Sequence, residues 1–240
     1  MRVAVFSDVH SNLSALVEIL NCISRMGVDL VLCGGDLVGY GPFPNEVVQT
    51  LRERRIPTIM GNYDEGVGFN MDDCGCAYRT EREVELGRVS LEWTKKNLRE
   101  ENKSFLRSLP RNQRYTWEGY RALHVHGSPR RINEYLYEDR PEKSLLRMLE
   151  PLDIDLLICG HTHIPYHRTV GGIHVVNTGS VGKPRDGDPR ACYTLLEVEK
   201  NLSVSFKRVP YDVEETCRAI RRAGLPQEFA EALKNPPSET

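Results

Sequence analysis

Short apolar runs alternate with helical patterns in the first part of the chain. Arg2–Ser7 has the length and composition of a buried strand, and apolar residues at helical spacing follow it until Gly27. The runs Leu30–Cys33 and Ile56–Met60 repeat the strand pattern, with a helical pattern over 47–51 between them. Strands that alternate with helices over short connections indicate an α/β fold with parallel strands in this part of the chain.

The pattern changes after residue 66. Residues 66–78 are irregular and residues 81–109 have a helical pattern, so 66–109 is predicted to be a helical insert near the functional site. Paired β-type runs then predict three hairpins, at 114–125, 166–176 and 193–209. Helical patterns and a flexible tail close the chain, at 213–223, 227–233 and 235–240. Without a linker in the middle, residues 1–240 are expected to form a single domain.

Composition excludes several classes of protein. A net charge of -2, with 28% charged and 40% hydrophobic residues, gives no overall attraction to duplex nucleic acid, so any phosphate recognition must be local. No apolar stretch reaches the length of a membrane span. Seven cysteines without an export signal predict reduced thiols in a cytoplasmic protein. For Cys74 and Cys76 a structural role is favoured over a metal-binding or redox role, because a lone C-x-C lacks a partner pair.

Potential metal ligands follow five of the apolar runs. In chain order they are Asp8, Asp36, Asn62, His126 and His161. In open α/β sheets, ligands bind beyond the carboxyl ends of the strands, so we expect these side chains to lie along one edge. His10 and His163 each stand two residues beyond one of them and complete a set of seven candidates.

The chemistry of the seven candidates indicates divalent metal ions. Carboxylate, amide and imidazole groups without thiolate argue against a structural zinc cluster and suit Mn²⁺ best, with Fe, Zn, Ni or Co as alternatives. Seven ligands are too many for one catalytic ion. Two ions roughly 3.5 to 4 Å apart could share them through a bridging carboxylate, and such a pair would activate water for in-line attack on phosphorus.

The same motifs, in the same order, resemble those of the calcineurin-like metallophosphoesterase family. The resemblance covers residues 2 to about 186 and lies in Asp8-Val9-His10, Gly35-Asp36, Gly61-Asn62-Tyr63-Asp64, His126-Gly127 and Gly160-His161-Thr162-His163. The stretches GDLVGYGPFPNEVV and NTGSVGKPRDGDPRA are similar to a small prokaryotic branch of phosphodiesterases and protein-phosphatase-like enzymes. The resemblance implies a four-layer α/β/β/α sandwich of two mixed β-sheets flanked by helices.

The resemblance also implies a role for each ligand. One ion would be held by Asp8, His10, Asp36 and His163, and the other by Asp36, Asn62, His126 and His161, with Asp36 bridging. A metal-bound hydroxide would hydrolyse a phosphoester, with phosphodiesters favoured over alkyl monoesters. The substrate is left open among phosphorylated small molecules, nucleotides and phosphoproteins, and a homo-oligomer is compatible with the sequence.

One position departs from the family pattern. Tyr63 stands where the family has a histidine that is thought to assist the leaving group, and a phenol with a pKa near 10 is a weaker acid. Tyr63 could still donate a hydrogen bond, His174 or a water could act as the acid, and Asp64 could orient a neighbour. The alternative is a metal-binding scaffold that has lost catalysis, as in the retromer subunit with this fold.

Basic loop residues are the candidates for substrate binding. Arg130, Lys183 and Arg185 could neutralise a phosphate, as could Arg190, although solvated loop charges would look the same in sequence. Tyr40 could line the cleft or pack within its turn.

Overall fold

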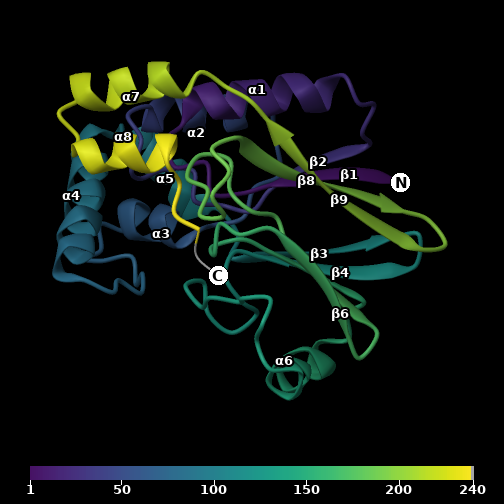
Figure 1. The fold of residues 1–240 in the computed structure, drawn as a ribbon. Helices are drawn as coiled ribbons and strands as arrows, with labels where there is room; N and C mark the ends of the chain where they lie inside the picture. Colours follow the sequence, from purple (N-terminus) through teal and green to yellow (C-terminus); the bar gives the residue numbers. More distant parts are fainter. Residues whose placement is uncertain (239–240) are drawn as a thin grey trace.

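The computed structural model describes residues 1–238, and strands in this part of the chain form two sheets (Figure 1). The four-stranded sheet has the order β2-β1-β8-β9, formed by Leu30–Cys33, Arg2–Phe6, Ala191–Val198 and Leu202–Val209. The five-stranded sheet has the order β3-β4-β5-β7-β6, formed by Asn112–Trp117, Tyr120–Val125, Leu156–Cys159, Ile173–Asn177 and Tyr166–Val170. A buried apolar layer with side chains from both sheets separates them.

Both sheets are mixed, as predicted. In the first, β1 runs parallel to β2 and antiparallel to β8. In the second, β5 lies between two parallel neighbours, β4 and β7, while β3 and β6 pair in antiparallel hairpins at the edges. The carboxyl ends of β1, β2, β4 and β5 therefore face the same end of the molecule, which is where the candidate ligands follow.

Helices cover the outer faces of both sheets. The helices of the described chain are α1 Leu13–Ser24, α2 Pro44–Glu53, α3 Asn62–Gly68, α4 Glu81–Asn97, α5 Glu100–Ser108, α6 Glu142–Leu149, η1 Glu150–Leu152, α7 Val213–Arg222 and α8 Gln227–Lys234. A large cluster joins the first sheet to α1, α2, α7 and α8 and continues into α3, α4 and α5, and a smaller one joins the second sheet to α6. The four-layer prediction is confirmed, with α1 and α7 on one side and α6 on the other (Figure 1).

Two predicted elements differ in the structure. Ile56–Met60 is not a full strand, because Pro57 has no N–H to donate, and only Thr58 forms a bridge, to Cys33 of β2. The helical pattern over 81–109 is broken after Asn97, where the Asn45 amide accepts from the Arg99 N–H and donates to the Asn97 carbonyl, both at 2.9 Å. These two bonds replace helical ones and turn the chain into α5.

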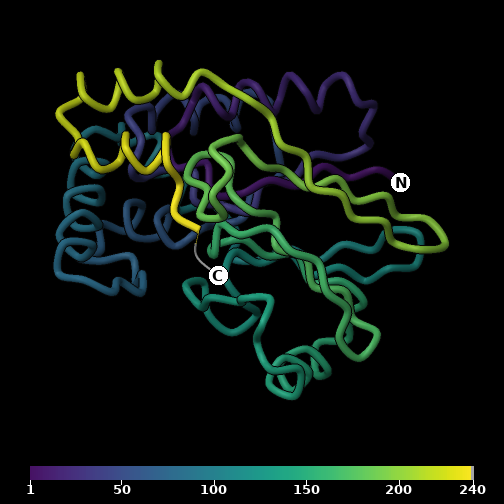
Figure 2. The backbone as a smooth tube through the Cα atoms, viewed as in Figure 1, coloured from purple at the N-terminus to yellow at the C-terminus, as the bar shows by residue number. Residues whose placement is uncertain are grey.

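The segment after α8 returns toward the loops beyond the strands (Figure 2). The Gly187 N–H donates to the Pro237 carbonyl at 3.2 Å, and Ser238 forms a bridge with Asp186. The expected flexible tail at 235–240 therefore has ordered contacts as far as Ser238, and residues 239–240 lie outside the described part. Across residues 1–238, no helix combines the length and apolarity that a membrane crossing requires.

Removal of the Asn45 amide is expected to loosen the α4–α5 junction. Asn45→Ala loses its bonds to Asn97, Arg99 and Asn102, which should lower the free energy of unfolding by about 1–3 kcal/mol in urea titrations. Gln49→Ala on the same helix removes only an exposed bond to Glu53 and should change stability by less than about 0.5 kcal/mol. Equal stabilities of the two variants would contradict this role for Asn45.

Candidate metal centre

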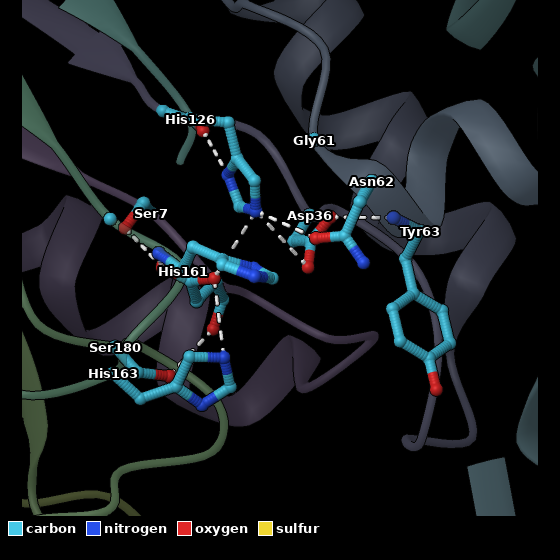
Figure 3. Close-up of polar contacts among 12 residues, drawn as sticks. Ser7, Asp36, Gly61, Asn62, Tyr63, His126, His161, His163 and Ser180 are labelled. Atoms are coloured by element: carbon cyan, nitrogen blue, oxygen red, sulfur yellow. Dashed lines mark hydrogen bonds and ion pairs between the residues drawn. The ribbon is translucent and has the colours of Figure 1, made fainter. Parts of the chain in front are cut away.

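Six of the seven candidate ligands lie in loops that follow strands, and Asn62 is the first residue of α3. Backbone hydrogen bonds join several of these loops. The Asp8 N–H donates to the Gly35 carbonyl at 3.0 Å, and the His10 N–H donates to the Asp36 carbonyl at 2.9 Å. In the second sheet, the Gly160 N–H donates to the His126 carbonyl at 2.8 Å. The convergence predicted from the strand ends is therefore present in the structure, where Asp36, Asn62, His126, His161 and His163 point toward one another (Figure 3). All seven side chains are buried.

The backbone is unusual at five of the ligands. Left-handed φ angles between 47° and 65° occur at Asp8, His10, Asp36, His161 and His163. Such conformations cost of order 1–3 kcal/mol each in residues other than glycine and persist only where the surroundings enforce them. Their concentration at one edge of the sheets marks this edge as a functional site.

The ligand atoms form two groups. Asp8, His10 and His163 make up one, Asp36, His126 and His161 the other, and within each group the ligand atoms lie within 4.8 Å of one another. Asp36 also faces the first group. Its Oδ2 is 3.5 Å from Nε2 of His126 in its own group and 3.6 Å from Nε2 of His10 in the first group. One carboxylate thus stands between the two groups.

Backbone carbonyls orient three of the imidazole rings. Nδ1 of His10 donates to the Val38 carbonyl at 3.1 Å, and Nδ1 of His126 donates to the Gly34 carbonyl at 2.8 Å. Nδ1 of His163 bonds in the same way to the Lys183 carbonyl. Because a carbonyl can only accept, Nδ1 carries the proton and Nε2 presents a lone pair to the centre of the site.

These lone pairs meet other acceptors. Nε2 of His10 and Nε2 of His163 are 3.2 Å apart, and Nε2 of His126 lies 3.0 Å from Oδ1 of Asn62, whose amide nitrogen donates elsewhere, to the Cys74 carbonyl. Oδ1 of Asp8 and Nε2 of His161 are buried without a hydrogen-bond partner. Nitrogen and oxygen atoms this close together in a buried site need positive charge between them, from a proton or from a metal ion, and this donor set fits divalent metal ions.

The titration of the site points the same way. Burial lowers the pKa of His10 and of His161 to about 3, so both rings are neutral at pH 7. Burial also lowers the pKa of His126, but the Asp36 and Asp8 carboxylates outweigh it and raise that pKa to about 10, so without a metal ion this ring carries a second proton on Nε2, which a bound cation would displace. Burial would raise the pKa of Asp8, yet the neighbouring histidines hold it well below its usual range. The site therefore favours ionised carboxylates and positive charge between them.

A comparison with known protein families shows to which family the chain belongs. Residues 1–201 match the calcineurin-like phosphoesterase superfamily domain. The chain belongs to the calcineurin-like phosphoesterase superfamily. It is a metallophosphoesterase by family, as the sequence motifs indicated.

Relatives from this superfamily are similar over most of the chain. An uncharacterised protein of Methanocaldococcus jannaschii is 34% identical over 96% of each chain, and the phosphodiesterase YfcE of Escherichia coli K12 is 23% identical over 82% of this chain and 88% of its own. The crystal structure of a metallophosphoesterase from Sphaerobacter thermophilus covers 98% of both chains at 32% identity and a TM-score of 0.77. A hypothetical protein from Pyrococcus horikoshii shares the fold, with a TM-score of 0.85 at 22% identity over 97% of each chain.

In this metallophosphoesterase, Tyr63 stands at the position where the family motif has a histidine. Its N–H donates to Oδ1 of Asp36 at 2.8 Å, while its ring lies edge-on to His10, with centroids 5.5 Å apart (Figure 3). The hydroxyl is buried 3.4 Å from that of Tyr78. Burial raises the pKa of Tyr63 well above its ordinary value, so the phenol stays protonated and can donate a hydrogen bond.

The structure gives Asp64 a supporting position. Its Oδ1 accepts from the Leu37 N–H at 2.9 Å and its Oδ2 accepts from the Gly61 N–H at 3.0 Å. The carboxylate thus joins the first turn of α3 to the loop that carries Asp36. Asp64 is therefore placed to orient the neighbouring ligand loops, the role expected from the sequence.

The prediction of His174 as a proton donor is wrong. His174 lies at the start of β7, opposite Leu156, whereas the metal site lies beyond the other end of these strands. His174 is three residue steps from Asn177 at the other end of β7, which corresponds to about 10 Å along the strand. Its ring bonds to His167 of the neighbouring strand, with Nδ1 and Nε2 3.0 Å apart.

The basic candidates divide between two places. Arg130 forms an ion pair with Glu134 and lines a separate cavity of about 430 Å³, and so it is not brought to the ligands. Lys183 and Arg185 line a cavity of about 490 Å³ together with Tyr40, whose ring centroid is 5.1 Å from that of His10. The backbone explains the difference, because the carbonyl of Lys183 itself binds the ring of His163 and so holds Lys183 beside the ligands.

Sequence reasoning missed the support of Asp8. The Ser7 hydroxyl donates to the Asp8 carboxylate and lies 2.8 Å from the Thr178 hydroxyl, and the Ser180 hydroxyl donates to the Asp8 carbonyl at 2.8 Å. The stretch Asn177–Ser180 was the available signal, and its Thr178 and Ser180 hydroxyls contact the loop that carries Asp8.

Metal binding should stabilise the folded protein. Treatment with EDTA is expected to lower Tm, and Mn²⁺ should restore it, because a ligand that binds only the folded state shifts the folding equilibrium. Asp36→Asn should abolish most of this shift, since it weakens the carboxylate that faces both groups. His174→Asn is the matched control and should respond to Mn²⁺ like the wild type. A normal Mn²⁺ shift in Asp36→Asn would contradict the assignment of Asp36.

Proposed function

We propose that this metallophosphoesterase hydrolyses phosphodiesters with two divalent metal ions, one in each ligand group. One observation carries the proposal: two groups of buried acceptors, each without enough donors, with the Asp36 carboxylate between them. The first ion would be held by Asp8, His10, His163 and Asp36, and the second by Asp36, Asn62, His126 and His161. Mn²⁺ is proposed for both, with Fe, Zn, Ni or Co as alternatives for this oxygen and nitrogen set.

The residues around the ligands set their orientation. Bound ions of this kind would supply Lewis acidity toward a phosphoryl group. They would also lower the pKa of water, so that hydroxide is available as the nucleophile at neutral pH. The carbonyls of Val38, Gly34 and Lys183 hold the rings so that Nε2 points inward. The Tyr63 N–H holds Asp36 in place.

Tyr63 supports a preference among leaving groups. A phenol whose pKa is raised by burial is a poor proton donor, so the leaving group would depart with little help from this side chain. Leaving groups of low basicity, such as phenolates, should then react faster than alkoxides. The cavity of about 490 Å³ beside the ligands has room for the second substituent of a diester and favours a small molecule or a nucleotide over a folded phosphoprotein.

Hydrolysis of bis(p-nitrophenyl) phosphate with Mn²⁺ tests the proposal. The wild-type protein should release p-nitrophenolate, and Asp8→Asn should lower kcat/KM by more than about 100-fold, the upper loss seen for groups that merely support metal ligands. His174→Asn should stay within about twofold of the wild type, because general acid–base groups contribute about 10²-fold or more and this residue is remote from the site.

Tyr63→Phe probes the departure from the family motif. Loss of the hydroxyl keeps the N–H bond to Asp36 and should lower kcat by about 10-fold or less, with a larger loss for alkyl than for aryl leaving groups. An equal loss for both classes would show that the hydroxyl does not act on the leaving group.

A metal-binding scaffold without catalysis is the second candidate function. The observation that favours it is the buried, protonated phenol at the position of the family's histidine. Full Mn²⁺ stabilisation without hydrolysis of either aryl or alkyl diesters would select the scaffold over the enzyme.

A further inference from the structure

An aromatic cavity opens beside the metal centre. It encloses about 490 Å³ and is lined by Tyr40, Tyr78, Tyr135, Tyr137 and Phe229 among other residues. Its walls come from five separate parts of the chain: the loop after β2, the segment 77–87 that leads into α4, the segment after β4, the loop 183–185 between β7 and β8, and α8 with the segment that follows it. Of these, α8 lies beyond residues 1–201, the part that matches the superfamily domain.

Three residues that line this cavity contact histidines of the candidate metal centre. The Tyr40 ring lies edge-on to His10, with centroids 5.1 Å apart, and the Tyr135 ring centroid is 4.0 Å from that of His161. Lys183 lines the cavity with its side chain, while its carbonyl bonds to a ligand ring. A group joined to a phosphate at the metal centre would therefore lie directly in this cavity.

The rings form surfaces that suit a flat group. Tyr135 and Tyr137 are stacked, with 10° between their planes and 5.7 Å between their centroids. Phe229 of α8 packs edge-on against Tyr40, at 85° and 5.3 Å, and so fixes the opposite side. Aromatic faces of this kind bind planar rings by stacking, whatever the ring carries at its edge.

Charged groups of both signs accompany the rings. The Lys183 amine lies 4.5 Å from the centroid of the Tyr40 ring, and Arg185, Glu83 and Glu228 also line the cavity. Glu228 pairs with Arg82 and Glu83 accepts from the Arg79 N–H. An apolar ring edge would remove these charged groups from water without adding a hydrogen bond, which costs free energy. A nucleobase carries donors and acceptors along its edge that carboxylates and guanidinium groups can bind.

We infer that this cavity is the subsite for the nucleoside of a nucleotide phosphodiester, with the base stacked on the tyrosines and α8 closing the far wall. The inference rests on the proposed function, because it names the substrate class of the same site. It also assigns part of the specificity to a helix outside the superfamily domain.

Binding to the Mn²⁺-loaded protein tests the subsite without hydrolysis. In calorimetric titrations, adenosine 5′-monophosphate should bind at least about 10-fold more tightly than methyl phosphate, since stacking on an aromatic side chain is worth that factor or more. Tyr137→Ala and Phe229→Ala should each weaken the nucleotide about fivefold or more and leave methyl phosphate unchanged. Tyr120→Ala, at the other end of β4, is the matched control and should bind both ligands like the wild type. Tyr137→Ala removes a half-buried ring and serves as the test if Phe229→Ala does not fold.

Several outcomes would overturn the inference. Equal affinities for the nucleotide and methyl phosphate would show that the cavity takes no nucleoside, and phenyl phosphate binding as tightly as the nucleotide would assign it to any aryl group. The proposed function is tested separately with thymidine 5′-(p-nitrophenyl) phosphate and methyl p-nitrophenyl phosphate, which share one leaving group. Nucleotide binding with the expected response of the variants, but no hydrolysis of either ester, would refute the proposed function and support the subsite.

Discussion

The structure depends on a buried set of acceptors that only cations can satisfy. Backbone carbonyls take the Nδ1 protons of three histidines, so the Nε2 lone pairs of those rings turn inward toward the carboxylates. Within the described residues, Oδ1 of Asp8 and Nε2 of His161 have no hydrogen-bond partner, although Oδ1 of Asp8 lies 3.3 Å from Nε2 of His163. In a low-dielectric interior such groups are costly, and their cost sets the need for metal. The loops that follow the strands, and the orientation of the first turn of α3, serve to hold this arrangement.

The two sheets supply the rigidity that the arrangement requires. Five ligands have left-handed backbone, and the glycines beside them let the loops approach closely, since a Cβ on Gly61 would overlap Asp36 and a Cβ on Gly160 would lie 2.5 Å from Oγ of Ser7. The surrounding backbone bonds outweigh this strain because they end on packed strands. Asp64 adds a bond to each of the two ligand loops and so couples α3 to the site.

Chemistry and specificity occupy different parts of the chain. The candidate metal ligands all lie within residues 1–201, the part that matches the superfamily domain. The cavity beside them is lined mainly by the segment 77–87, the segment after β4, the loop 183–185 and α8. A phosphoesterase scaffold can therefore keep its metal site while the surrounding segments change the group it accepts, which is how one fold serves several substrates.

The sequence by itself predicted most of the strands and the seven candidate ligands. Strand patterns are local, and a ligand directly after a buried strand has its position set by that strand, so the convergence of Asp8, Asp36 and His126 could be predicted. Contacts between residues far apart in the chain could not. His174 was a candidate acid in the sequence, but the strand register places it opposite Leu156. Arg130 was a candidate for substrate binding, but it forms an ion pair with Glu134. The place of Phe229 against Tyr40 was decided by tertiary packing alone, because no local pattern in α8 encodes what its apolar face meets.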